Sequence, residues 1–183
     1  AMIAAVTDLD GTVTGVHRPW LKRDGSAKAP IAYPRRAMGH LLGNGVRFGA
    51  SGPVMLAAEG IETLLSLRQV MPMLPAIAGL SAAHLAAIRF PAGLRRLYVA
   101  RDDDPAGTTA FTTLVQRALP VGIEIVPLDP RLDDFNSDLV NLGRRRIAQS
   151  LSAQLWSEDA AQFLDTGDGS GPSPRIGRQR PSP

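Results

Sequence analysis

The sequence VMLAAEG, residues 54–60, is a short apolar run that ends in an acidic residue and a glycine. Isoleucine and leucine residues follow it at helical spacing, so this stretch predicts a strand, a tight turn and a helix. LYVARDDD, residues 97–104, repeats the plan, with three aspartates after the apolar run and Pro105 opening the next helix. In an open parallel sheet, ligands bind outside the carboxyl ends of the strands. Both acidic turns are therefore expected at one edge of one sheet.

Carboxylates that gather at one sheet edge repel one another unless a cation compensates their charge. Hard oxygen ligands in a flexible surround suit Mg²⁺ or Mn²⁺. The chain has no cysteine and only three histidines, which are scattered, so neither a disulfide framework nor a zinc site is predicted. The sequence predicts a Mg²⁺ or Mn²⁺ site made of carboxylates.

Length and composition limit the architecture. The 183 residues, 44% of them hydrophobic, suffice for one α/β domain with a small appendage. No apolar run approaches the roughly 20 residues of a membrane helix, and the N-terminus lacks the plan of a signal peptide. We expect a soluble protein of the reducing cytoplasm with no membrane partner. The Ala1-Met2 start is typical of a domain cut from a longer protein, so the natural chain is expected to be longer.

Charge is distributed unevenly along the chain, whose net charge is +3. Residues 1–50 carry seven basic and three acidic side chains, whereas residues 51–140 carry seven basic and ten acidic ones. A basic flank beside an acidic, metal-binding centre suits a polyanionic substrate, because Lys and Arg hold phosphates. Charge alone leaves a merely solvated surface open as the alternative.

From Val54 onward, short apolar runs alternate with helical periodicity, as in α/β proteins. We predict strands at residues 54–58, 74–78, 95–100 and 122–128. We predict helices at residues 60–70, 81–89, 105–118 and from about 136. The predicted fold class is α/β, with a compact four-stranded parallel sheet flanked by helices and a small N-terminal β-rich subdomain.

The first fifty residues form that β-rich subdomain, which has a basic face. Asp10-Gly11 is a strong hairpin signal, so residues 3–7 and 12–18 are expected to pair as antiparallel strands. A short helix is predicted around residues 37–42. The predicted units are the basic subdomain at 1–50, the sheet domain at 51–142, a C-terminal helix at 143–164 and a disordered Gly-, Ser-, Pro- and Arg-rich tail at 165–183.

The sequence DLDGT, residues 8–12, matches the nucleophile motif of haloacid dehalogenase-type phosphatases. That motif needs Asp8 as nucleophile at the end of a buried parallel strand, with Asp10 as acid/base. Here the flanking sequence is hairpin-like and no helix follows, so an ordinary β-turn is the favoured interpretation.

The two acidic turns together resemble a Toprim domain, the metal-binding catalytic module of bacterial and phage primases, type IA and type II topoisomerases and certain nucleases. The family pattern places a Glu after the first strand and an Asp-x-Asp after the third. Glu59, Asp102 and Asp104 occupy these positions, and the resemblance covers about residues 50–142. Both segments, and the β-rich stretch before them, are similar to primase-like proteins carried by plasmids and phages.

The resemblance implies a primase-like nucleotidyltransferase that makes primers from nucleotides on single-stranded DNA, with Mg²⁺ or Mn²⁺. Glu59 would be the general acid/base or an additional metal ligand. Asp102 and Asp104 alternate along an extended segment and would hold the ion. Asp134, which begins a DFN motif, would supplement the metal site. The family often has another acid directly after the Asn, whereas here the next acid is Asp138.

Two acids have structural interpretations as well. Asp104 before Pro105 is a good N-cap. Glu62, near the start of the first helix, is favoured as a partner of the helix dipole or as a solvent-facing acid.

Basic and aromatic residues of the first fifty positions also have two interpretations each. Lys28, Arg35 and Arg36 would hold template or nucleotide phosphates by analogy with primases, or else be exposed hairpin charges. Trp20 or Tyr33 would stack a base, although a half-buried aromatic in a small sheet is the commoner role.

Two rival functions use the same chain differently. A Toprim nuclease would cut DNA with the same metals, and a non-catalytic nucleic-acid-binding module would need none. Primases often find their template with a cysteine zinc module, which this chain lacks. We therefore expect a helicase or an upstream template-binding domain as a partner, or DNA recognition of another kind.

Overall fold

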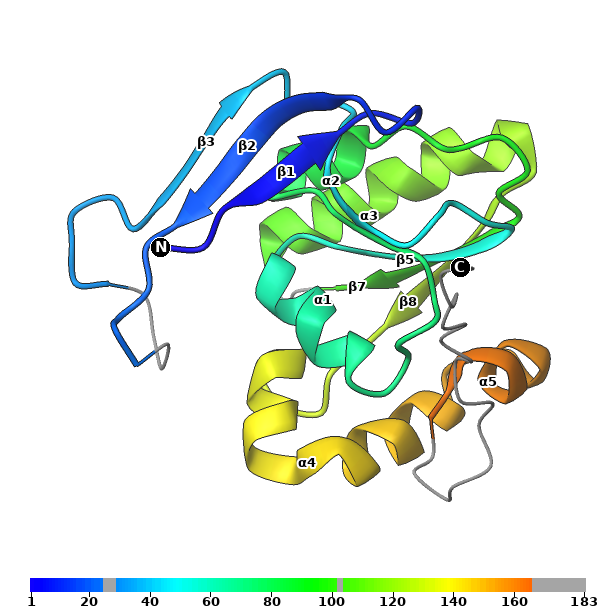
Figure 1. The fold of residues 1–183 in the computed structure, drawn as a ribbon. Helices are drawn as coiled ribbons and strands as arrows, with labels where there is room; N and C mark the ends of the chain where they lie inside the picture. Colours follow the sequence, from blue (N-terminus) through cyan, green and yellow to red (C-terminus); the bar gives the residue numbers. More distant parts are fainter. Residues whose placement is uncertain (25–28, 102–103, 166–183) are drawn as a thin grey trace, which may run out of the picture.

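Two β-sheets form the framework of the protein (Figure 1). The structure is a computed structural model that describes residues 1–24, 29–101 and 104–165. The first sheet has the order β1-β2-β3, with β1 at Ala4–Thr7, β2 at Val13–Pro19 and β3 at Arg35–Gly39. The second has the order β4-β6-β5-β7-β8, with β4 at Val46–Phe48, β5 at Val54–Ala58, β6 at Ala76–Ala78, β7 at Arg96–Ala100 and β8 at Glu124–Leu128.

The predicted α/β class and its four parallel strands are confirmed, since β6, β5, β7 and β8 run parallel in that order. A fifth strand, β4, pairs antiparallel with β6 and was not predicted. Its three residues are too few to show alternation, and Arg47 interrupts them. The predicted hairpin of the first sheet is also confirmed, because β1 and β2 pair antiparallel.

Helices cover both faces of the five-stranded sheet. On one face lie α1 (Ile61–Arg68), α4 (Phe135–Ser152) and α5 (Ser157–Phe163). On the other lie α2 (Ala82–Ala87) and α3 (Pro105–Ala118), which the short 3-10 turn η1 (Leu119–Val121) follows. Among the described residues, no helix combines the length and hydropathy that crossing a bilayer requires.

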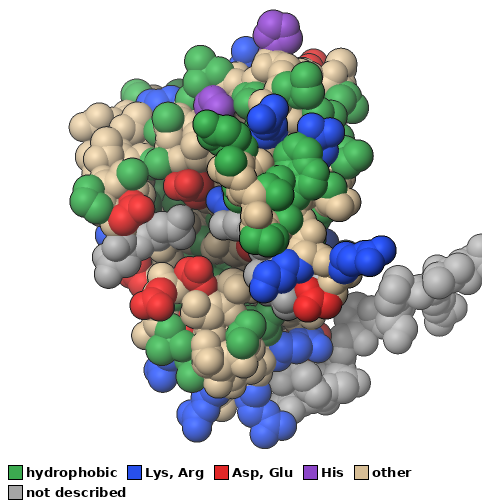
Figure 2. All heavy atoms as spheres, turned by 90° about the vertical axis from the view of Figure 1, so that its left-hand side faces the viewer, with side chains coloured by type: hydrophobic (Ala, Val, Ile, Leu, Met, Phe, Trp, Pro, Cys, Tyr) green, Lys and Arg blue, Asp and Glu red, His purple; other side chains and the backbone are tan. Residues whose placement is uncertain are grey.

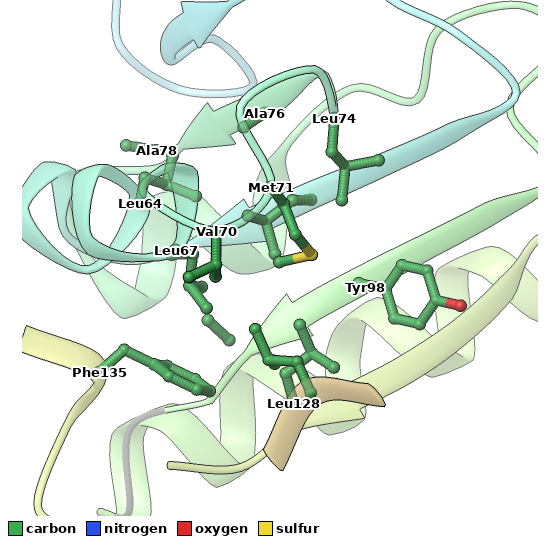
Figure 3. Packing of buried hydrophobic residues seen from close by; sticks show 14 of the residues in the cluster. Leu64, Leu67, Val70, Met71, Leu74, Ala76, Ala78, Tyr98, Leu128 and Phe135 are labelled. Atoms are coloured by element: carbon green, nitrogen blue, oxygen red, sulfur yellow. The ribbon is translucent and has the colours of Figure 1, made fainter. Parts of the chain in front are cut away.

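β5 is buried along its whole length, which explains its continuous apolar sequence. Alternate residues serve the two faces, with Leu56 and Ala58 packing toward α1 and α4, and Met55 and Ala57 toward α2 and α3. Figure 3 shows Phe135 from the start of α4 entering the same apolar cluster as the leucines of α1. Each such large buried side chain contributes about 1.5–3 kcal/mol.

The predicted short helix around residues 37–42 is wrong, because its first half, residues 37–39, belongs to β3 and pairs antiparallel with β2, and no helix follows at residues 40–42. Gly39 lies opposite Gly15 and has a φ of +105°, which is incompatible with helix. A Cβ on Gly15 would lie 2.6 Å from the carbonyl oxygen of Met38, so the two strands approach too closely for larger residues. Pairing with a distant strand overrides the helix-forming tendency of Ala37 and Met38.

The segment predicted as a single C-terminal helix, residues 143–164, contains the second half of α4 and the separate α5. Gly143 has φ 77° and ψ 167°, which breaks the helical path of α4. α4 therefore bends at this glycine, and its second half reaches the sheet through Ile147 and Leu151.

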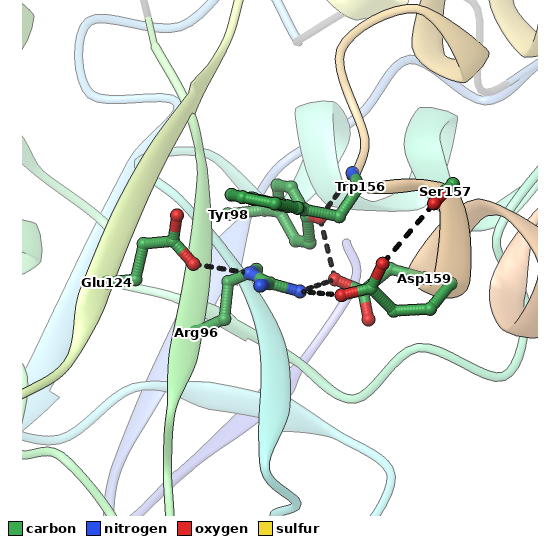
Figure 4. Close-up of polar contacts among 7 residues, drawn as sticks. Arg96, Tyr98, Glu124, Trp156, Ser157 and Asp159 are labelled. Carbon is green, nitrogen blue, oxygen red and sulfur yellow. Dashed lines mark hydrogen bonds and ion pairs between the residues drawn. The ribbon is translucent and has the colours of Figure 1, made fainter.

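α5 is held against the sheet by a polar network around Asp159 (Figure 4). Asp159 is 3% exposed, and its Oδ2 accepts hydrogen bonds from Arg96 Nη1 at 2.6 Å and from the Tyr98 hydroxyl at 2.7 Å. Burial, and then the bond to Asp159, raises the pKa of the Tyr98 hydroxyl, so this group remains a donor. Arg96 also pairs with Glu124 and stacks 4.6 Å from the Trp156 ring centroid.

We predict that Asp159→Ala lowers the free energy of unfolding by about 3 kcal/mol, because it leaves a largely buried guanidinium and a buried hydroxyl without their shared acceptor. Urea unfolding followed by circular dichroism measures this loss. Glu158→Ala is the matched control, since this carboxylate is exposed and pairs with the same Arg96. A loss no larger than the control's would contradict the role of Asp159.

Candidate metal and phosphate site

The four parallel strands end in one row. Ala58 of β5 lies opposite Ala78 of β6 and Ala100 of β7, and Ala100 lies opposite Leu128 of β8. The residues that follow each strand therefore emerge side by side at the carboxyl edge, on the left-hand side of Figure 1. Glu59 follows β5 directly, and the segment 101–104 follows β7.

The winding of the sheet reverses at this edge. From β5 the chain crosses to β6 on one side, and it later forms β7 on the other side of β5. In open α/β sheets, ligands bind at such a reversal, outside the carboxyl ends of the strands. Glu59 and Asp104 follow the two strands that flank the reversal, as the sequence predicted for the acidic turns.

Each parallel strand leads into a helix, and the longer ones that begin at this edge are α1 after β5, α3 after β7 and α4 after β8. Helix N-termini carry partial positive charge and unpaired N–H groups, which favour anions and phosphates. Figure 2 looks onto this edge and shows acidic side chains gathered at mid-height, with Lys and Arg side chains beside and below them. The edge combines acidic groups for a cation with helix ends for an anion.

The predicted carboxylates sit in different local structures. Glu59 is half-buried, and its carbonyl oxygen accepts from the Leu80 N–H at 2.8 Å, which fixes the turn after β5. Asp104 is exposed and caps α3, with Oδ1 accepting from the Gly107 N–H at 2.6 Å. Asp134 is half-buried and caps α4 through the Ser137 N–H, also at 2.6 Å. Asp102 lies outside the described residues.

A divalent metal fits these groups by donor chemistry. Glu59, Asp104 and Asp134 offer only carboxylate oxygens, and each cap uses Oδ1, so Oδ2 of Asp104 and of Asp134 remains for a second ligand. Within residues 1–24, 29–101 and 104–165, no three acidic or histidine side chains are close enough to hold an ion.

The DFN segment is tied to α1. Ser66 Oγ, one turn along α1 from Glu62, lies 3.4 Å from Asn136 Oδ1 and donates to it. Asp138, the acid displaced by one position from the family pattern, is 1% exposed and accepts from the N–H groups of Arg131 and Leu132, both at 2.9 Å. Asp138 thus fixes the loop before α4 with both of its carboxylate oxygens.

Arg35 brings the first sheet to this edge. Its Nη2 lies 3.2 Å from Oε1 of Glu62 in the first turn of α1. Oε2 of the same carboxylate lies 3.5 Å from where a Cβ would sit on Gly60, so Glu62 folds over the Glu59-Gly60 turn. The sequence favoured Glu62 as a solvent-facing acid or dipole partner, and its contact with Arg35 was missed because 27 residues separate the two.

Lys28 and Arg36, the other predicted phosphate ligands, are not brought to this edge within the described chain. Lys28 lies outside the described residues. Arg36 neighbours Arg35 on β3, and successive side chains of a strand point to opposite faces. Arg36 accordingly lies 5.5 Å from the Tyr33 ring centroid, on the face away from α1.

The phosphatase interpretation of DLDGT is wrong. Asp8 Oδ1 accepts from the N–H groups of Asp10 at 3.0 Å and Thr12 at 2.9 Å, which closes the turn between β1 and β2. β1 pairs antiparallel with β2, and no helix follows the motif. The carboxylate of Asp8 is used by the hairpin, as the β-turn interpretation predicted.

His17 lies beneath the contact between Arg35 and Glu62. It is on β2, 6% exposed, and its Nδ1 has no hydrogen-bond partner among the described residues. Burial lowers the pKa of His17, Glu62 acts in the opposite direction, and Arg35 lowers it further. The imidazole of His17 therefore takes up a proton only at a lower pH than an ordinary histidine does.

Comparisons with known proteins agree with this geometry. Residues 54–145 match the Toprim domain family, and residues 1–48 match a domain of unknown function, DUF7146. No curated protein matches the chain.

Solved primase structures share the fold at low identity. The primase fragment of the bacteriophage T7 primase-helicase protein has a TM-score of 0.58 and 17% identity, covering 84% of this chain and 62% of that fragment. The T7 primase domains solved with the lagging-strand DNA polymerase, an RNA/DNA hybrid and dTTP have a TM-score of 0.52 and 16% identity. This match covers 81% of this chain and 74% of that chain. A DNA primase domain from Pseudomonas aeruginosa has a TM-score of 0.54 and 16% identity, and the match covers 83% of this chain and 50% of that chain. The chain thus spans 62% of the first T7 fragment and half of the Pseudomonas domain.

We predict that the free energy of unfolding falls as the pH drops from about 7.5 to about 5.5, partly through His17. Because the pKa of His17 is lowered in the folded protein, the unfolded chain takes up the proton at a higher pH than the folded protein does. Between the unfolded and the folded pKa of His17, the free energy of unfolding falls by at most about 1.4 kcal/mol per pH unit. Urea unfolding at both pH values should show a shallower dependence for His17→Gln. His40→Gln, which changes an exposed histidine, should retain the wild-type dependence. Equal dependence in all three proteins would contradict the prediction.

Proposed function

Because the chain belongs to the Toprim domain family, we propose that it catalyses metal-dependent nucleotidyl transfer on DNA, with primer synthesis on a single-stranded template as the reaction. The observation that carries the proposal is the shared strand-end row, from which Glu59 and the 101–104 turn emerge at the reversal of the sheet. The primase-type fold of the neighbours supports the same reaction class.

We assign the chemistry to the acids of this edge. Glu59 is the general acid/base or an additional metal ligand, Asp102 and Asp104 hold the metal, and Asp134 supplements them. A bound Mg²⁺ or Mn²⁺ would make the attacking 3′-hydroxyl more acidic and compensate the charge on the phosphates. The positive N-terminal ends of α1, α3 and α4 orient those phosphates.

Arg35 is the proposed phosphate ligand at the mouth of the site, and Lys28 is proposed to assist it. The ion pair of Arg35 with Glu62 is exposed on both sides, with 42% and 37% of the side chains accessible, so it contributes little stability. An entering polyphosphate offers a stronger and bidentate partner to the same guanidinium. Glu62 therefore holds Arg35 ready beside Glu59 until substrate arrives.

The partners follow from the same proposal. One T7 neighbour belongs to a primase-helicase protein, and another was solved with an RNA/DNA hybrid and dTTP. We propose single-stranded DNA and nucleotides as substrates, and a helicase or an upstream template-binding domain as the protein partner. In this division of labour, residues 1–50 hold nucleic acid and residues 51–142 carry the chemistry.

We predict that Glu59→Gln and the double variant Asp102→Asn, Asp104→Asn each lower primer synthesis by about 10²–10⁴-fold. The assay is Mg²⁺- or Mn²⁺-dependent incorporation of labelled ribonucleotides on single-stranded DNA. Asparagine caps helices as well as aspartate does, so the double variant should keep α3 intact. Asp133→Asn is the matched control, an exposed acid beside Asp134 that has no assigned role.

Other outcomes of this assay separate the rival functions. Metal-dependent shortening of the DNA, lost in the same variants, would assign the site to a nuclease. Synthesis that persists in both variants would contradict the assigned residues. Neither synthesis nor cleavage, together with DNA binding in the absence of metal, would indicate a binding module.

We further predict that Arg35→Ala raises the KM for the nucleoside triphosphate by about tenfold or more, since a charge-assisted hydrogen bond to phosphate is lost. Its free energy of unfolding should change by less than about 1 kcal/mol, because the ion pair with Glu62 is exposed. Glu62→Gln should have the opposite effect on KM, because it removes the competing carboxylate. Steady-state kinetics of both variants, with thermal unfolding in parallel, test this. A raised KM in Glu62→Gln would contradict the holding role of Glu62.

A further inference from the structure

Two arginines lie directly opposite each other on the solvent-facing side of the first sheet. Arg18 of β2 is the cross-strand partner of Arg36 of β3, and both side chains are exposed. Like charges at directly opposed positions of a sheet are destabilising. Two arginines that emerge from directly opposed positions are suited to hold an anion.

Each arginine is accompanied by its own aromatic ring. The guanidinium of Arg18 lies 4.1 Å from the centroid of Trp20, and that of Arg36 lies 5.5 Å from the centroid of Tyr33. Trp20 is half-buried, whereas Tyr33 is 68% exposed. The rings share the face with the arginines, so flat apolar surfaces lie within reach of the same anion.

This face is separate from the metal site and is open. On β2, His17 and Pro19 point the other way and are buried. On the open face Met38 is 68% exposed, and all five residues of β3 are exposed. Lys22 and Arg23 follow β2 and are exposed as well. Figure 1 shows β3 as the outer strand of its sheet.

We propose that this face binds single-stranded nucleic acid, with Arg18 and Arg36 on the phosphates and Trp20 and Tyr33 stacked on unpaired bases. A positive surface supplies affinity for the backbone, and aromatic rings accept bases of any sequence because every base has a flat face. A duplex keeps its bases stacked internally, so it would use only the arginines. The occupant is therefore a strand with unpaired bases.

Strand β3 connects this face to the proposed active site. Arg35 and Arg36 are adjacent on β3 and point to opposite sides, Arg35 toward Glu62 and Arg36 toward the open face. A nucleic-acid strand that lies on the open face and passes around the edge of β3 would meet Arg35 next. Binding to the open face does not depend on metal chemistry, so it stands or falls independently of the proposed reaction.

The test is binding of a roughly 15-nucleotide oligo(dT) in the presence of EDTA. The chain has two tryptophans, so in a Trp156→Phe background Trp20 is the only one and reports directly on stacking. Trp20 fluorescence should be quenched on binding. In an anisotropy titration the double variant Arg18→Gln, Arg36→Gln should bind about tenfold more weakly or worse. The slope of log affinity against log salt, between about 50 and 200 mM, should become shallower by about 1.4.

The control is Arg95→Gln, which removes an exposed charge just before β7. Arg95 lies at the amino ends of the parallel strands of the large sheet, opposite their carboxyl edge. Its affinity should stay within about twofold of the wild type, because it lies away from the open face. Equal loss in Arg95→Gln would reduce the effect to net charge and overturn the proposal. Unchanged Trp20 fluorescence at saturation, or equal affinity for a duplex of the same length, would also overturn it.

Folding and binding should respond differently. Removing Arg18 relieves its repulsion with Arg36 but also loses its contact with the Trp20 ring, so Arg18→Gln should unfold close to the wild-type temperature, while it binds oligo(dT) more weakly. A variant that lost binding together with its thermal transition would indicate a structural role for Arg18 and contradict the proposal.

Discussion

The site depends on one constraint of chain path: β5 is placed between β6 and β7, so the sheet winds in both directions from it. Parallel strands in matched register end together, and Ala78, Ala58 and Ala100 form one row. Whatever follows these strands is brought to one edge without any direct contact between the segments. Glu59 and the turn after β7 are neighbours for this reason, although more than 40 residues separate them in sequence.

The same edge explains why structural and functional interpretations of its acids do not exclude each other. Asp104 and Asp134 each cap a helix with one carboxylate oxygen. The cap fixes the carboxylate at the positive end of the helix, where its negative charge is stabilised. The second oxygen is then held in place for another ligand at little additional cost in conformational entropy. A residue that is a good N-cap can therefore also serve as a well-ordered ligand.

Elements with strong local patterns could be predicted from sequence, whereas elements created by distant pairing could not. The continuous apolar runs of β5 and β7 and the capping Asp104 identified the sheet and its edge. β3 was mistaken for a helix because only its pairing with β2, and the close approach of Gly15 and Gly39, make it extended. β4 was missed because three residues around Arg47 show no period. The contact between Arg35 and Glu62 and the opposition of Arg18 and Arg36 depend on the packing and register of the first sheet, which no local motif encodes.

The register of that sheet also gives its two sides different chemistry. Because side chains alternate, a one-residue shift of β3 would exchange Arg35 and Arg36 between the faces. The register is held on the other side, where the buried His17 lies opposite Ala37 and Gly15 closely approaches Gly39. The open side then receives Arg36 opposite Arg18, an arrangement that packing alone would not favour. The proposed polyanion would account for a like-charged pair on an otherwise well-determined sheet. Because side chains alternate along β3, Arg35, which faces the carboxylate edge, would be the next cation that such an anion meets.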